Sequence, residues 1–486
     1  MKCKFDKDKL KGGPGGPGSP GGGVAGVEPP LRGAPEARRA VGRGETGDFQ
    51  SLPLLKILVL LLITSPVFGL DLETARAMAL ANSRTLARYN LAVGSAQLDE
   101  KIQKYGTLPS LSLGASASAS ILGEVPLWDS VSAGASFGVT QQIYNRGKNA
   151  LLKSISGMAT GIARQDALAE YFAVLDAADA AYYGVLEAEA ALAASESALE
   201  AAAFALSTAE IRRENGMIGY GDYLQALAEK EAKETARNQA RRDLTLGRVT
   251  LKNLTGQAEL QDLEEVDFEA WEELIQKLAG LSEEGAAAFL ERFRGAATAN
   301  NPTLVKAALA GSRAEQEVSL AKREYFPTLS AGVSGGLNYS VMNGFDVPSG
   351  RLSLSASFPL DVWVTKSNVD KKVIARTEAV LAKQNAEVSL DVEIQTAVLD
   401  LITQAMSALS SRRADEYARR HYEQVLESYR LSSASVAQLS DAAALAGSNR
   451  TQYIKARYGF LAGLSKIRSL GSFSSDEELR AFLLSW

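Results

Sequence analysis

Four segments of this chain alternate between apolar and small polar residues, and they come in two pairs. The first pair covers residues 110–121 and 131–140, and the second covers 329–341 and 352–360. Strict alternation places one residue set on each face of a β-strand. The segments between the members of each pair, 122–130 and 342–350, are rich in turn-forming residues. Each pair therefore predicts a hairpin, one over 109–144 and one over 327–361.

The predicted strands carry almost no charge on their polar face, which consists mainly of Ser and Gly. Strands of about ten residues with one apolar face are typical of membrane-spanning β-barrels, although a soluble sandwich sheet shows the same alternation. Four strands cannot close a barrel in lipid, because an open edge leaves unpaired backbone groups. Since the smallest such barrels need about eight strands, the membrane interpretation requires several chains to combine their hairpins.

Long helical stretches separate the two hairpins. Residues 148–215 contain no Pro and are dominated by Ala, Leu, Glu, Lys and Arg, which predicts one helix of about 100 Å. Its apolar residues form two heptad rows, as in a coiled coil: Leu168, Leu175 and Tyr182 in one, and Tyr171, Ala178, Val185, Leu192, Leu199 and Leu206 in the other. The first row fails at Glu189. Glycines in 215–221 end this helix, and a second one over 223–254 is predicted to return along it.

The chain is a tandem duplication. The sequence A-L-A-N-S-R-T-L from Ala79 returns as A-T-A-N-N-P-T-L from Ala297, and the Pro before each hairpin recurs after 327 − 109 = 218 residues. The second copy repeats the long helix over 371–431, the break at 432–435 and the return toward 470. The copies are predicted over 70–256 and 291–471. An acidic segment, 257–290, joins them as a solvated linker or an equatorial girdle, and a tail follows over 472–486.

These motifs resemble the TolC-like outer-membrane efflux proteins, the exit ducts of tripartite export machines. The resemblance covers about 72–471 and rests on L-E-T-A-R-A-M-A-L-A-N-S-R-T-L, the L-P-S-L and F-P-T-L strand entries, the two helix breaks and the closing Y-I-K-A-R-Y-G-F-L-A-G-L-S-K-I-R-S-L-G. Arg84 departs from the Pro that is usual in the opening motif, whereas Pro302 keeps it. No single motif is specific, but their order, spacing and duplication together are.

The resemblance implies a mainly α fold with β, assembled as a homotrimer. Three chains would give four strands each to a twelve-stranded transmembrane β-barrel, and their helices would form an α-helical barrel through the periplasm. The implied function is the passive outer-membrane exit duct of a tripartite efflux or type I secretion system. Its partners would be outer-membrane lipid, a periplasmic adaptor protein and an inner-membrane pump. A periplasmic coiled-coil scaffold without channel activity is the alternative.

The two helix breaks would form the periplasmic tip of such a duct. Family members often place acidic residues after the break, where a ring of carboxylates narrows the pore and disfavours anions. Asp222 occupies this position in the first copy, whereas the second copy departs from the pattern with Gln438 and has Asp441 three residues further on. Carboxylates in the first turns of a helix are also favoured by its dipole, so both roles stay open for Asp222 and Asp441. The resemblance assigns adaptor docking to the turns at Gly216, Gly219, Ser432 and Ser435.

The N-terminal 69 residues differ from the rest. Residues 1–50 are of low complexity, rich in Gly and Pro near their start, and are predicted to be disordered. Residues 51–69 have a lysine, an apolar run and the small-residue site V-F-G, which indicates a cleavable signal peptide. The resemblance implies that the exported chain lies in the outer membrane of a Gram-negative-type bacterium, with a periplasmic extension. Because export signals seldom begin so late, we expect translation to start near Leu52. Detection of a peptide from Arg32–Arg43 in cells would refute this.

Composition mainly excludes other functions. His421 is the sole histidine and Cys3 the sole cysteine, so a multi-His metal site and an internal disulfide are not expected. There is no P-loop and no catalytic constellation, so neither a cofactor nor an enzymatic activity is predicted. A net charge of −5 argues against nucleic acid as a partner. The tail, with Phe482 and Leu484 alternating before Trp486, resembles a barrel-assembly signal.

Overall fold

The computed structural model describes residues 69–119, 131–341, 343–431 and 433–485. All of them belong to the second of two compact units, Ile63–Trp486. Predictions for 1–50, for most of the signal segment 51–69, and for Ser432 and Trp486 lie outside the described residues.

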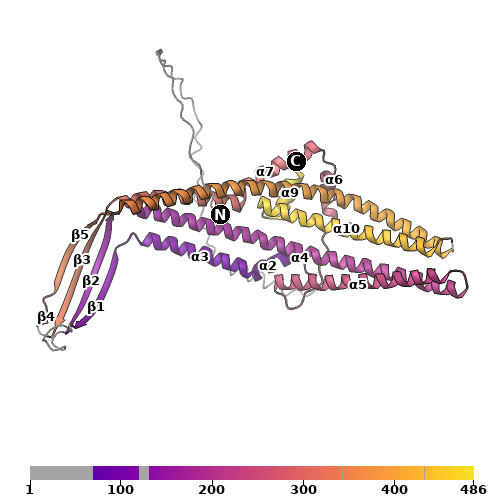
Figure 1. Ribbon diagram of the computed structural model, residues 1–486, viewed down its shortest axis with the longest axis horizontal. Helices are drawn as coiled ribbons and strands as arrows, with labels where there is room; N and C mark the ends of the chain where they lie inside the picture. Colours follow the sequence, from indigo (N-terminus) through magenta and orange to yellow (C-terminus); the bar gives the residue numbers. More distant parts are fainter. Residues whose placement is uncertain (1–68, 120–130, 342, 432, 486) are drawn as a thin grey trace, which may run out of the picture. The chain divides into compact units, whose positions relative to one another are not determined.

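The same order of elements occurs twice (Figure 1). The first copy has α2 (Leu72–Asn82), α3 (Arg84–Tyr105), β1 (Ser110–Ala119), β2 (Val131–Tyr144), α4 (Lys148–Glu214) and α5 (Tyr220–Thr255). The second has α7 (Glu283–Asn300), α8 (Pro302–Lys322), η3 (Arg323–Tyr325), β3 (Thr328–Ser340), β4 (Gly344–Phe345), β5 (Ser349–Ser357), α9 (Val362–Arg430) and α10 (Val436–Gly471). Between them lie η2 (Glu269–Trp271) and α6 (Glu272–Ala279), and α11 (Asp476–Leu484) follows. The predicted mainly α, duplicated architecture is confirmed.

The repeated opening motif is a joint between two helices. In the first copy the Ser83 hydroxyl accepts a hydrogen bond from the Leu86 backbone N–H at 3.1 Å, and in the second Asn301 does the same for Thr303 at 2.9 Å. These side chains satisfy N–H groups that a helix start leaves without a partner. Arg84 and Pro302 both occupy the first residue of the new helix. Pro suits that position because no N–H is needed there, but other residues are also accepted.

The long helices form as predicted but α9 starts earlier. The sequence interpretation began this helix at Lys371, whereas α9 begins at Val362 and has 69 residues. The missed segment contains β-branched and aromatic residues of low helix propensity, so the pattern gave no helix signal there. In α4, which has 67 residues, Glu189 interrupts the heptad row because it pairs with Arg248 of α5 at 2.7 Å. The interruption is thus an ion pair between the two helices.

All strands belong to one antiparallel sheet in the order β1-β2-β3-β5, with the short β4 also pairing with β3. The two hairpins predicted from separate copies therefore pair with each other through β2 and β3. The predicted hairpin 327–361 is shorter than expected at its end: β5 stops at Ser357, and Phe358 and Leu360 lie beyond it. Because β2 precedes α4 and β5 precedes α9, the sheet adjoins the starts of both long helices (Figure 1).

The acidic segment 257–290 is folded and packs on the core, so it is not a solvated linker, while its place in an equatorial girdle stays a prediction. It contains α6 and the start of α7, and α6 packs on α9 with Leu274, Ile275 and Leu278 buried in the largest core. Its acidic residues remain at the surface, where Glu265 pairs with Arg457 and Glu272 pairs with Arg412. The predicted copy boundary at 290–291 falls inside α7, which begins at Glu283. Charge dominated the composition of this segment and hid its amphipathic period.

The tail is a helix packed on the core, and not a barrel-assembly strand. In α11, Leu479 and Leu483 are buried, and the Phe482 ring packs against Phe293 and Phe473. Leu479 and Leu483 are spaced by four residues, as on one face of a helix.

No helix in the described part of the chain combines the length and the apolarity needed to cross a membrane.

A cluster of buried charges joins the chain's first and last described helices. Asp179 of α4, with a fully buried side chain, accepts hydrogen bonds from Arg76 of α2 at 2.5 and 2.9 Å and from Arg468 of α10 at 2.7 Å. Both arginines also pair with Asp476 of α11, at 2.6 and 3.0 Å. Although burial opposes the charged form of Arg76, the carboxylates of Asp179 and Asp476 raise its pKa.

Candidate functional site

One face of the sheet is apolar across all four long strands. The pairing register joins Leu111, Val139, Val333 and Leu352 in one row across β1, β2, β3 and β5. Directly paired residues in an antiparallel sheet lie on the same face. Three of these side chains are exposed in the single chain, with Leu111 and Leu352 each 82% exposed, and Val139 is half-buried. An apolar surface of this extent marks a face that contacts lipid or another protein.

The opposite face is polar and is built from small residues. Its corresponding row is Ser112, Gly138, Ser334 and Arg351. Within the described residues, β1 pairs only with β2, and β5 pairs only with β3, so both outer strands have an edge with unpaired backbone groups. Such edges are normally covered or paired with another strand.

The first helix break, between α4 and α5, depends on glycine. Gly216 has a φ of +70°, and the N–H of Met217 donates to the Arg212 carbonyl at 2.8 Å. A left-handed residue at this position is the usual end of a helix and favours glycine. The second break, between α9 and α10, closes with the Ser433 N–H on the Ser428 carbonyl at 2.9 Å. The two breaks therefore occur at matching places in the two copies but use different residues.

The helices that follow the breaks begin with similar caps. The Gly219 N–H donates to the Asp222 carboxylate at 3.3 Å, and the Ser435 N–H donates to the Gln438 side-chain oxygen at 2.8 Å. The Ser435 hydroxyl in turn accepts a hydrogen bond from the Gln438 N–H at 3.2 Å. The structure thus gives Asp222 and Gln438 the same local role at the third residue of a helix. Asp441, one turn further along, is exposed.

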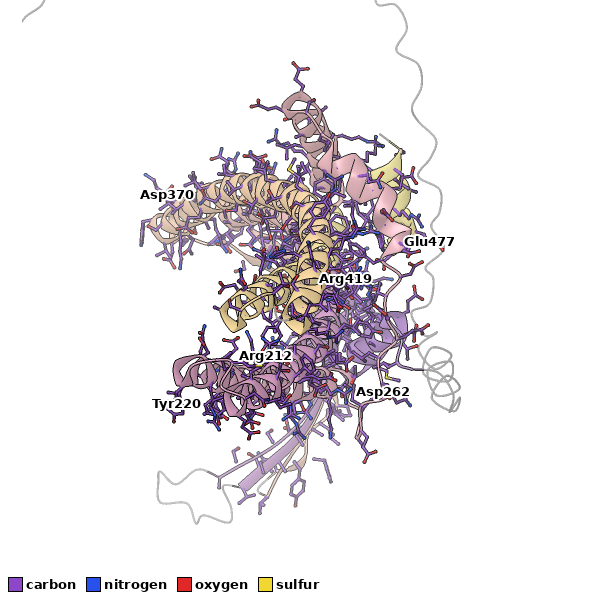
Figure 2. All side chains as sticks on the ribbon, turned by 90° about the vertical axis from the view of Figure 1, so that its right-hand side faces the viewer. Arg212, Tyr220, Asp262, Asp370, Arg419 and Glu477 are labelled. Atoms are coloured by element: carbon purple, nitrogen blue, oxygen red, sulfur yellow. The ribbon has the colours of Figure 1, made fainter. Side chains whose placement is uncertain are left out.

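The two breaks pack against each other through one tyrosine. Tyr429, near the end of α9, is fully buried in a cluster with Ala209, Ala226 and Leu439. Arg212 of α4 lies over the Tyr429 ring, with 4.1 Å between its guanidinium carbon and the ring centroid, and donates to the Tyr429 carbonyl. Figure 2 shows Arg212 on the side of the α4–α5 pair that faces α9 and α10.

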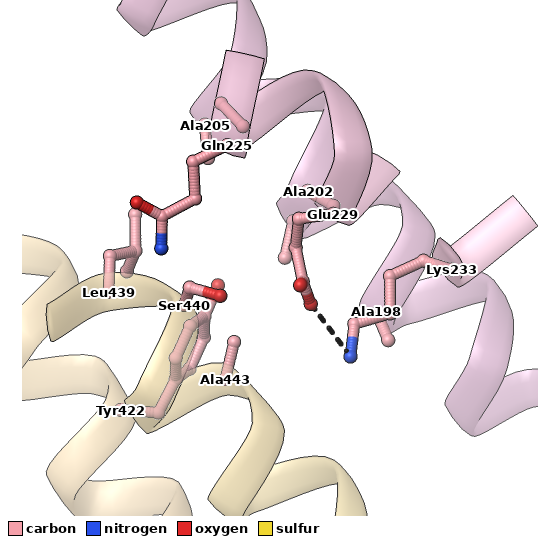
Figure 3. A pocket seen from close by; sticks show the side chains of 12 residues that line it. Ala198, Ala202, Ala205, Gln225, Glu229, Lys233, Tyr422, Leu439, Ser440 and Ala443 are labelled. Atoms are coloured by element: carbon pink, nitrogen blue, oxygen red, sulfur yellow. Dashed lines mark ion pairs between the residues drawn. The ribbon is translucent and has the colours of Figure 1, made fainter. Parts of the chain in front are cut away.

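Next to this cluster is a pocket between the two helix pairs (Figure 3). It is lined by Ala198, Ala202 and Ala205 of α4, Gln225 and Glu229 of α5, and Tyr422 of α9. Glu229 is held by Lys233 at 2.9 Å. The alanines leave space between the helices because their side chains are short. The two pairs pack closely beside Tyr429 and again in the largest core, where Tyr182 and Val185 of α4 share a buried cluster with residues of α9 and α10.

Known proteins share the sequence pattern of this chain. The model of the family "Outer membrane efflux protein" matches twice, over residues 75–257 and 294–470, which together make up most of the chain. The chain belongs to the outer membrane efflux protein family. No curated protein sequence matches this efflux protein.

Solved structures of outer-membrane channels share its fold. The Campylobacter jejuni CmeC outer membrane channel is 17% identical with a TM-score of 0.69, covering 85% of this chain and 89% of that one. The outer membrane protein VceC from Vibrio cholerae is 17% identical with a TM-score of 0.68, covering 82% and 96%. The open state of the Neisseria gonorrhoeae MtrE outer membrane channel is 18% identical with a TM-score of 0.60, covering 82% and 88%.

Family membership settles the main functional alternatives. The efflux protein is an exit duct of the outer membrane, and its family consists of channels and not of enzymes. The expected resemblance to TolC-like proteins is confirmed, and the periplasmic scaffold without channel activity is superseded.

Sequence reasoning missed two features of the site. The contact of Arg212 with Tyr429 joins residues that are 217 positions apart, and the charged cluster around Asp179 joins residues up to 400 apart. Neither set forms a spacing motif. A charged residue within an apolar helix face, such as Asp179 beside Ala178 and Tyr182, was the only available signal.

Proposed function

We propose that three copies of the efflux protein combine their sheets into one twelve-stranded barrel in the outer membrane, through which cargo leaves the cell. The long helices would continue this duct into the periplasm, where an adaptor protein and an inner-membrane pump engage the helix breaks. The pump would select the cargo and supply the energy, as in an efflux or type I secretion system. The four-stranded sheet with an exposed apolar face and two open edges is the observation that carries this proposal.

Aromatic residues lie at the ends of the strands that adjoin the helices, and they support the placement of the sheet in the membrane. Tyr105 precedes β1, Tyr325 precedes β3, and Phe358 and Trp363 follow β5; their exposed fractions are 62%, 37%, 65% and 70%. Membrane barrels carry girdles of aromatic side chains where the hydrocarbon region meets water. These residues lie at the level where the sheet joins the helices, which would be the periplasmic surface of the membrane.

Opposite-face lysine substitutions test the proposal. Leu113, 89% exposed on the apolar face, would contact lipid, where a lysine costs about 2–4 kcal/mol near mid-membrane. Leu113→Lys should therefore greatly reduce the oligomer seen on unheated gels of outer-membrane fractions. Ser116→Lys, on the polar face of the same strand, should assemble like the unmodified protein. Equal behaviour of the two variants would contradict a lipid-facing apolar surface.

At the periplasmic tip, Asp222, Gln438 and Asp441 would line the pore constriction. The exposure of all three side chains leaves them available to a pore, while the caps made by Asp222 and Gln438 would fix their positions. Replacement of Asp222 and Asp441 by Asn should lower the preference for cations in single-channel recordings, because Asn keeps a cap but removes the charge. An unchanged preference would place these carboxylates outside the pore.

The turns at Gly216, Gly219, Ser432 and Ser435 would dock the adaptor. Gly216, Gly219 and Ser435 are exposed, as an external docking site requires. Cysteine introduced at Gly219 should be cross-linked to the adaptor in cells by a short bifunctional reagent. Cysteine at exposed Ser367, near the sheet end of α9, should give no such product. Adaptor cross-linking at both sites, or at neither, would count against tip docking.

Export would use the predicted signal segment 51–69, with cleavage after Gly69. Leu70 is 2% exposed, and its N–H donates to the Asp262 carbonyl at 2.8 Å. The Tyr182 hydroxyl donates to the Leu70 carbonyl at 2.8 Å. These contacts would hold a mature chain that starts at Leu70. N-terminal sequencing of the outer-membrane form should begin at Leu70, and a sequence starting upstream of residue 51 would refute both the cleavage and the expected translation start.

A further inference from the structure

A single charge stands on the strands of the sheet. Among the described residues of β1, β2, β3, β4 and β5, Arg351 is the only Asp, Glu, Lys or Arg. Its side chain is exposed and makes no ion pair with any residue that the structure describes. The remaining polar residues of these strands are uncharged. The carboxylate Asp346 lies just beyond β4, where its N–H donates to the Asn338 carbonyl of β3 at 2.8 Å.

The pairing register places Arg351 on the polar face. Arg351 pairs with Ser334 of β3, and Ser334 pairs with Gly138 of β2, which in turn pairs with Ser112 of β1. The next residue, Leu352, pairs with Val333 and belongs to the apolar row. An arginine on the apolar face would be costly in lipid, whereas a position on the polar face keeps its guanidinium in water.

The neighbours of Arg351 are too small to cover it. Ser334, Gly138 and Ser112 share its row, and Gly332 and Ser353 follow on the same face toward the helices. Arginine is the longest side chain in this row and stays charged at all ordinary pH values. Its guanidinium would therefore extend past its neighbours into whatever space the polar face encloses.

We propose that Arg351 is a specificity-determining residue of the outer part of the duct. This inference rests on the proposed three-chain barrel, in which three copies of Arg351 form one ring of positive charge on the pore wall. Such a ring would attract cargo that carries carboxylate, sulfonate or phosphate groups and repel cationic cargo. Its guanidinium groups can bind these planar or tetrahedral anions through two N–H groups at once.

The dimensions of a twelve-stranded barrel make the ring effective. With strands about 4.8 Å apart and tilted by roughly 40°, the backbone radius is about 12 Å. An arginine that reaches about 6 Å inward leaves the three guanidinium groups about 10 Å from each other. This separation is close to the Debye length of about 8–10 Å at physiological salt, so their fields overlap across the lumen.

A thiol placed beside the ring measures its local potential independently of the periplasmic tip. The only cysteine of the sequence, Cys3, lies upstream of the proposed cleavage site, so Ser334→Cys, introduced in the row of Arg351, is the one thiol of the mature chain. Membranes are then treated with an anionic sulfonatoethyl or a cationic trimethylammonium-ethyl methanethiosulfonate. We expect the ratio of anionic to cationic labelling rates to fall by about fivefold when Arg351→Gln is added. Arg351→Lys should retain most of the ratio.

The controls separate failure of this inference from failure of the duct. Val333→Cys, on the apolar face, should react with neither reagent once the protein is in the membrane. If Ser334→Cys is labelled but the ratio of rates is the same with and without Arg351→Gln, the charge ring is refuted while the duct stands. If Val333→Cys is labelled and Ser334→Cys is not, the polar face does not line the lumen, and the proposed barrel itself is wrong.

Discussion

At the scale of single residues, Asp179 has the largest predicted effect on stability. Its side chain is fully buried between Arg76 and Arg468, and the Ser465 hydroxyl also donates to it at 2.7 Å. Asp179→Asn would leave Arg76 and Arg468 with Asp476 as their remaining carboxylate, and it should lower the free energy of unfolding by about 3–5 kcal/mol. Chemical denaturation of the purified protein should show this loss. Asp166→Asn, which breaks the partly exposed pair of α4 with Lys306, should cost less than about 1 kcal/mol.

Asp176, one turn before Asp179, gives the protein a distinct pH dependence. Burial raises the pKa of Asp176 to about 6, against the lowering effect of a hydrogen bond from Ser469. Because the folded-state pKa lies above the unfolded value, folding is favoured most at low pH, and this contribution is lost as pH rises from about 4 to 6. Asp176→Asn should therefore stabilise the protein at pH 7 by about 1–2 kcal/mol.

The measurement compares unfolding midpoints of the two proteins between about pH 4 and pH 8. Asp476 contributes in the opposite direction: burial opposes its ionisation, but Arg76 and Arg468 hold its pKa below the ordinary value, so its stabilisation is lost as pH falls. Since Asp476 is present in both proteins, the difference between them isolates Asp176. A difference that does not grow from about pH 4 to pH 7 would contradict the assignment.

At the scale of elements, the sequence predicted those whose signal is periodic and repeated. Alternation identified both hairpins, and the heptads with the Gly-rich break identified α4 and α5. The start of α9 was missed because its β-branched and aromatic residues have low helix propensity. The helices α6 and α11 were misassigned because acidic charge and the alternation of Phe482 and Leu484 were weighted above the helical spacing of the buried leucines. The contacts of Asp179 and Tyr429 could not be predicted, since they join distant residues without a spacing rule.

The break between α4 and α5 is an element whose geometry one residue controls. Gly216 has a φ of +70°, which a β-branched residue adopts only with strain, so Gly216→Val should destabilise the turn by more than about 1 kcal/mol. Hydrogen exchange at the Met217 amide, which donates to Arg212, should accelerate accordingly. Gly219→Ala is the matched control, because its φ of −76° suits any residue. Slow exchange in Gly216→Val would show that the turn does not need glycine.

At the scale of the whole molecule, the single chain is an incomplete structure. Its sheet has an apolar face that stays exposed in the described part of the chain, and two open edges, β1 and β5. Pairing of the β1 edge of one chain with the β5 edge of the next would cover both open edges, because a closed barrel has no edges. The apolar face of that barrel would then contact lipid. Membership of the outer membrane efflux protein family is consistent with this closure.

The oligomeric state in the outer membrane tests this account most directly. Cells are fractionated, the outer membrane is extracted with a mild detergent, and the protein is examined on an unheated gel and by native mass spectrometry. We expect a trimer from the outer-membrane fraction that dissociates to single chains on heating. A monomer in the soluble fraction would mean that the four strands fold on themselves, and it would contradict the shared barrel and the duct.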